Sequence, residues 1–214
     1  PVPTDFPIEK LGSENFERLT VALLRAELGA HVQVFGRGPD GGREATYDGT
    51  INWGRTAEGP SAQWAGYTVF QAKFRINAGQ RPREDGHWLA GQVKAELKAW
   101  RSGRPGRMPT NIVFITNARL SGVAESGGID SINKLLDQQL DEPKARDHPE
   151  TSLRARGLTN FLVIHRDTLI AQLNANVSAR LGFNLVSEGD ILERLNQCML
   201  PTDTDEMRAL LVQH

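Results

Sequence analysis

The hydrophobic pattern begins with a helix. Apolar residues recur three and four positions apart between Ser13, a typical N-cap residue, and Gly29, a typical residue just beyond a helix. The apolar face of this segment consists of Phe16, Leu19, Leu23, Leu24 and Leu28. The sequence therefore predicts that the fold starts with a helix over residues 13–28.

Beyond this helix the pattern alternates between strands and helices. Stretches typical of strands follow at 32–34, 44–53, 67–74, 112–115 and 161–164. Helical spacing is found at 89–100, 129–136, 169–177 and 187–199, and loops are expected at 35–42, 54–65, 102–109 and 143–149. Because strands interleave with helices, the sequence predicts an α/β domain with a mixed sheet flanked by helices.

The chain is expected to form a single domain over residues 1–214. No linker is long enough to divide it, and a chain of 214 residues can bury a sizeable core. We expect the core at about 13–120 and a helical C-terminal extension at about 125–214.

The composition is that of an ordinary soluble globular protein, with 39% hydrophobic and 24% charged residues. No apolar run is as long as the roughly eighteen residues that a membrane span requires, so no membrane partner is expected. The chain start lacks the features of a signal peptide. The single cysteine, Cys198, cannot form an internal disulfide, which favours a cytoplasmic location and an inert core thiol.

Charge is unevenly distributed, although the net charge is only −1. Nine basic residues stand against three acidic ones between Lys73 and Arg107, whereas seven acidic residues stand against three basic ones between Glu125 and Glu150. A surface with a positive face and an acidic back is compatible with contact to phosphates. A solvated surface of mixed charge is the other interpretation.

The third predicted strand carries polar residues where a buried strand would carry apolar ones. Side chains alternate along a strand, so Gln71 and Lys73 share one face with Val69, while Phe70 and Ala72 share the other. Burying an amide and an ammonium group without partners would cost several kcal/mol. Either this strand end is exposed, or both groups face a polar cleft.

Two carboxylates, Asp40 and Glu44, flank the turn before the second predicted strand. A hairpin places that strand beside the third, so a carboxylate near its start can meet Gln71 and Lys73. A carboxylate, an amide oxygen and backbone carbonyls are the hard oxygen ligands that Mg²⁺ prefers. Bound metal would activate a water for attack on a phosphate, and Lys73 would orient that water or neutralise the developing charge.

These residues resemble a known nuclease family. The run Gly38-Pro39-Asp40-Gly41-Gly42-Arg43-Glu44, followed by Val69-Phe70-Gln71-Ala72-Lys73, is similar to the Asp-Gly-Gly-x-Asp…Gln-x-Lys signature of Mrr-like restriction endonucleases, a branch of the PD-(D/E)xK superfamily. The first helix, with Phe16-Glu17-x-Leu19, resembles that of the family, and the similarity covers roughly residues 13 to 120. Residues 164–169 more weakly resemble nuclease modules that precede STAND-type NTPases in bacterial antiviral systems.

The resemblance implies a restriction-endonuclease-like fold and an Mg²⁺-dependent endonuclease, with Mn²⁺ as a substitute metal, that cuts double-stranded DNA. Carried over by position, Glu44 and Gln71 are metal ligands, Lys73 is the catalytic lysine, and Glu17 is the acidic residue of the first helix. Glu44 replaces the usual Asp, so Asp40 is an alternative metal ligand, with Glu44 preferred. The family context further implies a homo-oligomer formed through a larger antiphage defence protein.

Further residues are candidates for other roles. Arg75, Lys94 and Lys98 are candidate nucleic-acid contacts, although Lys94 and Lys98, one helical turn apart, fit a solvated face equally well. We expect His165 to be a hydrogen-bonded structural residue in preference to a catalytic one, and Asp48 to belong to a turn.

Two other functions stay compatible with the sequence. One is a catalytically inactive nuclease-fold module that binds nucleic acid or mediates assembly, which the unusual Glu44 and the near-neutral charge suggest. The other is a nuclease that acts on RNA, because a metal site recognises phosphate and not sugar.

Overall fold

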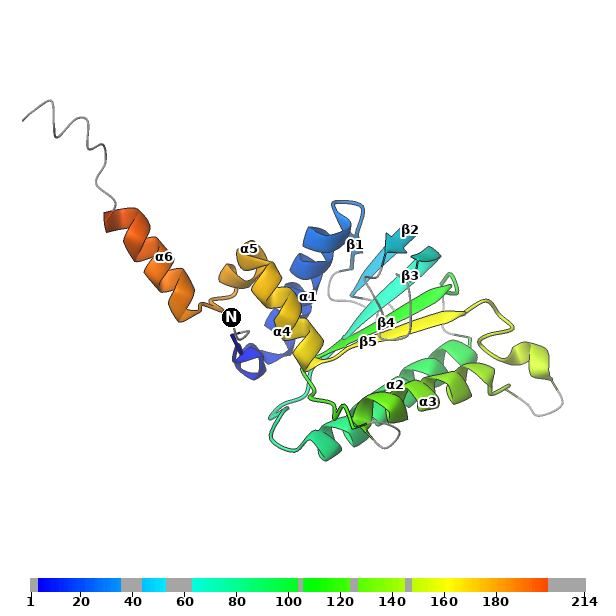
Figure 1. Cartoon of the computed structure of the whole chain (residues 1–214). Helices are drawn as coiled ribbons and strands as arrows, with labels where there is room; N and C mark the ends of the chain where they lie inside the picture. The colour runs from blue at the N-terminus through cyan, green and yellow to red at the C-terminus, as the bar shows by residue number, and fades with distance from the viewer. Residues whose placement is uncertain are drawn as a thin grey trace, which may run out of the picture.

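The fold is a five-stranded mixed sheet with helices on both faces (Figure 1). The computed structural model describes residues 4–35, 44–52, 63–103, 106–123, 127–144 and 148–199. In chain order and in spatial order the strands are β1 (Gln33–Val34), β2 (Ala45–Asn52), β3 (Gln63–Lys73), β4 (Asn111–Thr116) and β5 (Asn160–Ile164). The predicted class, an α/β fold with a mixed sheet flanked by helices, is confirmed.

The helices form a layer on each side of this sheet. They are α1 (Gly12–Leu28), α2 (Pro82–Arg101), α3 (Gly128–Asp141), α4 (Arg166–Ala175), α5 (Val177–Leu181) and α6 (Glu188–Met199), with short 3₁₀ turns η1 (Ile8–Lys10) and η2 (Pro149–Thr151). Helices α2 and α3 cover one face, α1, α4 and α5 lie on the other, and α6 extends away from the sheet (Figure 1).

Strand directions bring one end of the sheet together. β1, β2 and β3 are antiparallel neighbours, whereas β3, β4 and β5 run parallel. Ala45 at the start of β2 pairs with Phe70 near the end of β3, and Lys73 at that end pairs with Thr116 of β4. The start of β2 and the carboxyl ends of β3 and β4 therefore lie at the same edge, the usual position of ligand sites in open α/β sheets.

Each face of the sheet has its own hydrophobic core. Phe70 and Ala72 of β3 pack in the core that includes α1 and α4, whereas Val69 packs in the core that includes α2 and α3. The predicted alternation of this strand is thus confirmed. A strand buried on both faces needs apolar residues on both, which makes Gln71, on the Val69 side, an exception.

Some predicted boundaries are wrong. α1 begins at Gly12 and its N-cap is Leu11, because the chain passes directly from η1 through Gly12 at φ +74°; Ser13 lies inside the first turn. α4 begins at Arg166, three residues before the helical spacing predicted from 169, and its N-cap is His165, without a side-chain cap bond.

Other boundaries also shifted. β3 begins at Gln63, inside the stretch predicted as a loop, because it pairs with Asn52 at the end of β2. The helix predicted over 169–177 is interrupted at Asn176 between α4 and α5. The prediction near Ser187 is confirmed, since its hydroxyl accepts from the N–H of Asp190 at 3.2 Å. The division into a core and a C-terminal extension stays a prediction.

No helix within the described ranges is long and apolar enough to cross a membrane. The side chain of Cys198 lies outside the described part of the chain.

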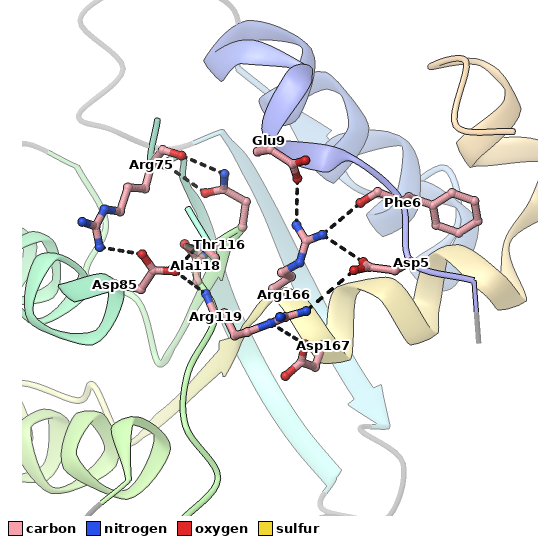
Figure 2. A network of polar contacts seen from close by, with 12 residues as sticks. Asp5, Phe6, Glu9, Arg75, Asp85, Thr116, Ala118, Arg119, Arg166 and Asp167 are labelled. Carbon is pink, nitrogen blue, oxygen red and sulfur yellow. Dashed lines mark hydrogen bonds and ion pairs between the residues drawn. The ribbon is translucent and has the colours of Figure 1, made fainter. Parts of the chain in front are cut away.

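A buried carboxylate fixes α2 against the ends of β3 and β4. Asp85 is fully buried; its Oδ1 accepts from the Arg75 guanidinium at 2.6 Å, and its Oδ2 accepts from the N–H groups of Gly79 at 2.7 Å and Arg119 at 2.9 Å (Figure 2). The amide of Asn117 bonds both the N–H and the C=O of Arg75, at 2.8 and 2.9 Å. Three chain segments are thereby joined at this edge.

A second ion cluster, around the buried Arg166, ties the N-terminal segment to α4. The Arg166 guanidinium donates to Asp5 at 2.9 Å, to Glu9 at 3.0 Å and to the C=O of Phe6 at 3.2 Å (Figure 2). Its N–H bonds the C=O of Ala118, just beyond β4. The N-terminal segment is therefore part of this edge of the fold.

We expect Asp85→Ala to lower the free energy of unfolding by about 3–5 kcal/mol, because it leaves the Arg75 charge and two N–H groups without their buried acceptor. Urea denaturation measures the change. Glu84→Ala is the matched control: Glu84 is the neighbouring acid but is half exposed, so its loss should lower the free energy of unfolding far less than that of Asp85. Equal effects of both substitutions would contradict the role assigned to Asp85.

Candidate active site

Glu44, Gln71 and Lys73 lie together where β2 begins and β3 ends. The N–H of Glu44 donates to the C=O of Phe70 at 3.2 Å, immediately before the Ala45–Phe70 pair. Glu44 is thereby next to Gln71 on the neighbouring strand. The hairpin predicted from the sequence does bring the carboxylate, the amide and the ammonium group to one place.

The Glu44 carboxylate is largely buried. Its Oε2 atom has no hydrogen-bonding partner in the described part of the chain. Burial raises its pKa from 4.5 to about 7; the positive charge of Lys73 and hydrogen bonds from the backbone of Glu44 and Ala72 lower the pKa, and the negative charge of Glu17 raises it. At neutral pH this carboxyl group is therefore close to half protonated.

Gln71 is fully buried with an unsatisfied side chain. Neither its Oε1 nor its Nε2 finds a partner among the residues that the structure describes. A buried polar group without a hydrogen bond destabilises a fold by about 1–3 kcal/mol. Two such residues side by side, Glu44 and Gln71, mark a place where a ligand would complete the hydrogen bonding.

Lys73 pairs with an acidic residue that the sequence analysis missed. Its Nζ lies 3.4 Å from Oε2 of Glu96 on α2, and the two side chains are only 15% and 9% exposed. Glu96 faces the sheet because it lies next to the apolar stripe that includes Val93 and Leu97. The position of Glu96 in the sequence could have revealed it, because a charged residue beside the buried face of a helix requires a partner.

Glu17 of α1 also belongs to the surroundings of this site. Its charge raises the pKa of Glu44, so it lies near enough for electrostatic interaction. This agrees with its position in the predicted site, although its role stays a prediction.

Asp40, the alternative ligand, lies outside the described residues, so Glu44 and Asp40 stay open alternatives. Within the described ranges, no three His, Cys, Asp or Glu side chains form a group that could hold a metal ion. The oxygen atoms offered here are those of one carboxylate and one amide. Both are hard ligands of the kind that Mg²⁺ accepts together with waters.

The candidate nucleic-acid contacts do not join this site. Arg75 is paired with Asp85 and lies 3.5 Å from Glu84, so its charge is already balanced. Lys94 and Lys98 are exposed. At 100° per residue they point away from the side of α2 that is buried, so any contact they make with phosphate lies away from Lys73.

Asp48 and His165 were both assigned structural roles from the sequence. Asp48 lies within β2 and pairs with Arg107, so the predicted turn is wrong. His165 Nε2 is 3.4 Å from the Thr168 hydroxyl, but its Nδ1 is buried and has no partner in the described part of the chain. Burial lowers the pKa of His165, which the charge of Asp167 partly counteracts.

The fold and the site together define an α/β domain with an acid, an amide and a lysine gathered at one edge of a mixed sheet. Compared with models of protein families, with curated proteins and with solved structures, the chain has no match. The resemblance to Mrr-like nucleases therefore stays a prediction.

We expect Glu44→Gln to stabilise the protein at high pH when EDTA is present. Ionisation of Glu44 above its unfolded-state pKa of 4.5 is opposed by burial up to about pH 7, so the wild type loses stability as pH rises through this window. The Glu44→Gln variant has no carboxyl group at this position, so it keeps its stability through the same pH window. The difference in free energy of unfolding should grow from near zero at pH 4 to about 2–3 kcal/mol at pH 8, measured by urea denaturation.

Glu14→Gln on α1 is the control, since the Glu14 side chain is largely exposed. Its stability should follow that of the wild type at every pH. Parallel curves for Glu44→Gln and the wild type would show that Glu44 is not buried as described.

Proposed function

We propose that this chain is a metal-dependent endonuclease domain that hydrolyses phosphodiester bonds in double-stranded DNA. The observation that carries the proposal is that Glu44 Oε2 and both amide atoms of Gln71 are buried without a partner in the described part of the chain, next to Lys73. In a stable fold, unpaired buried groups of this kind are expected where a ligand binds.

The residues fit a hard divalent cation. The Glu44 carboxylate and the Gln71 amide oxygen would hold Mg²⁺ or Mn²⁺, with Asp40 as the alternative acidic ligand and waters completing the coordination. The metal, when bound, lowers the pKa of a water and stabilises charge on a scissile phosphate. Because Glu44 must be ionised to bind a cation, binding at neutral pH releases part of a proton.

Lys73 would act on the phosphate. An ammonium group has three donors, so Lys73 can keep one hydrogen bond to Glu96 and still donate to a phosphate oxygen. The separation of 3.4 Å from Glu96 is long for a charge-assisted hydrogen bond, which leaves the ammonium group room to approach substrate. In this role Glu96 is a positioning residue that holds the Lys73 ammonium group in place.

The wider setting follows from the resemblance and from chemistry. Cutting both strands of a duplex usually needs two active sites, which favours a homo-oligomer formed through a larger protein. The similarity to modules ahead of STAND-type NTPases supports a cytoplasmic antiphage role.

One observation favours a second candidate function, an inactive module that binds nucleic acid or mediates assembly. With a pKa of about 7, Glu44 is only partly charged at neutral pH, which weakens its attraction for a cation. A titration with Mn²⁺ distinguishes the two functions, since the inactive module should bind no metal through Glu44.

We expect Lys73→Ala to slow cleavage of plasmid and linear duplex DNA about 10²–10³-fold in Mg²⁺, because the donor that stabilises the transition state is lost. Glu44→Ala should abolish cleavage, and EDTA should stop the wild type. Gel assays with a matched RNA duplex decide between DNA and RNA as substrate.

Lys144→Ala is the control, since Lys144 is also a lysine but is exposed and lies beyond the end of α3. It should keep most of the activity. Full activity of Lys73→Ala at matched stability would sink the catalytic role of Lys73.

We expect Glu96→Gln to reduce the turnover number about tenfold with little change in KM. The amide can still accept a hydrogen bond from Lys73 but no longer balances its charge, so the ammonium group is held less firmly. Steady-state kinetics on a short duplex measure both constants. Glu84→Gln, on the exposed side of the same helix, should match the wild type. A raised KM with unchanged turnover would assign Glu96 to binding instead.

A further inference from the structure

A second hollow lies away from the candidate active site. A cavity of about 320 Å³ is enclosed by α1, β2, the ends of β4 and β5, and α4. It shares no lining residue with the cluster of Glu44, Gln71 and Lys73. Sites for small molecules typically have volumes of roughly 300–1,000 Å³, so this cavity is large enough for a small ligand.

The inner walls of the cavity are apolar, whereas Tyr47, Thr50, Asn52 and Gln172 add polar groups to the rest of its lining. The inner walls are formed by side chains of the core between α1 and the sheet, namely Leu23, Leu24, Ile51, Ile115 and Ile164. All five are at most 5% exposed. The body of a ligand in this position would therefore be apolar.

Polar groups stand at intervals along α1. Thr20 lines the cavity, is 1% exposed, and its hydroxyl has no partner in the described part of the chain. Glu27, two helical turns further on, lines the cavity as well, and its Oε1 accepts from the Asn176 amide at 2.9 Å. At 1.5 Å per residue the two are separated by about 10 Å along one face of the helix.

The charge of the cavity is negative. Glu27 is the single charged side chain among the described residues that line it, and no lysine, arginine or histidine accompanies it. A negatively charged ligand such as a nucleotide would meet repulsion and find no cation. An ammonium group would instead find a carboxylate at one end of an apolar hollow.

From these observations we propose that the cavity binds a small apolar amine. The apolar body occupies the space between the leucines of α1 and the isoleucines of the sheet, and the ammonium group pairs with Glu27. A hydrogen-bonding group at the other end of the ligand meets the Thr20 hydroxyl. This proposal does not depend on the proposed nuclease function.

The cavity is nevertheless connected to the active-site elements. Thr20 lies one helical turn after Glu17, and Ile115 pairs with Ala72, which precedes Lys73 in β3. A bound ligand would contact α1 and β4 without touching Glu44 or Gln71. Binding to the cavity can therefore be measured without any assay of cleavage.

Three indole compounds test the proposal: tryptamine, whose side chain ends in an ammonium group, indole-3-acetate, whose side chain ends in a carboxylate, and indole, which has neither side chain nor charge. Calorimetric titration of the full chain should show saturable binding of tryptamine at one site, weaker binding of indole, and none of indole-3-acetate. Glu27→Gln should reduce the affinity for tryptamine about tenfold, to that for indole, whereas Glu14→Gln, on the same helix but outside the cavity, should not change it.

Thr20→Val provides an independent variant of nearly the same shape. Because it removes an unpaired hydroxyl, it should melt no lower than the wild type, yet it should bind both tryptamine and indole about threefold more weakly. Absence of saturable binding, equal binding of indole-3-acetate, or tryptamine affinity unaffected by Glu27→Gln would each overturn the proposal.

Discussion

The docking of α2 by two buried carboxylates is the constraint on which the candidate site depends. Asp85 and Glu96 are eleven residues apart, which places them on the same side of the helix. They pair with Arg75 and Lys73, two residues apart at the end of β3. A buried charge without a partner is strongly destabilising, so these pairs hold the helix in one register on the strand. That register sets the position of the Lys73 ammonium group.

Polar side chains at this edge of the sheet differ in how completely they are hydrogen-bonded. Asp85 accepts three short hydrogen bonds, and Asn117 completes the backbone bonding of Arg75. Earlier in β3, Gln71 is buried, and neither of its amide atoms has a partner among the residues that the structure describes. A fold that fully satisfies one polar network could satisfy its neighbour too. At Gln71 and Glu44 the described part of the chain leaves buried atoms unpaired, at some loss of stability, and this is where a ligand would be expected to bind.

Local patterns in the sequence were enough to predict the fold class, the hairpin and the two faces of β3. Alternation assigns Gln71 and Lys73 to one face, and a short hairpin brings Glu44 beside them, so most of the site follows from neighbouring segments. Glu96 could not be found in this way, because its pairing with Lys73 depends on how α2 docks against the sheet, which neither strand alternation nor a hairpin specifies. Arg75 was assigned to nucleic acid for the same reason: its buried partner Asp85 is revealed only by tertiary packing.

The charge balance around Lys73 explains why Glu44 has so high a pKa beside a lysine. Lys73 has two carboxylates to compensate, and its ion pair is with Glu96, which is itself nearly buried. The attraction that remains for Glu44 is smaller than the penalty for burying its charge, so burial dominates and the pKa stays near 7. When no metal is bound, a protonated Glu44 leaves the Lys73–Glu96 pair balanced and Glu17 as the nearby negative charge. A divalent ion that bound there would exchange for that proton, so its affinity would be coupled to pH through a group whose pKa lies close to neutrality.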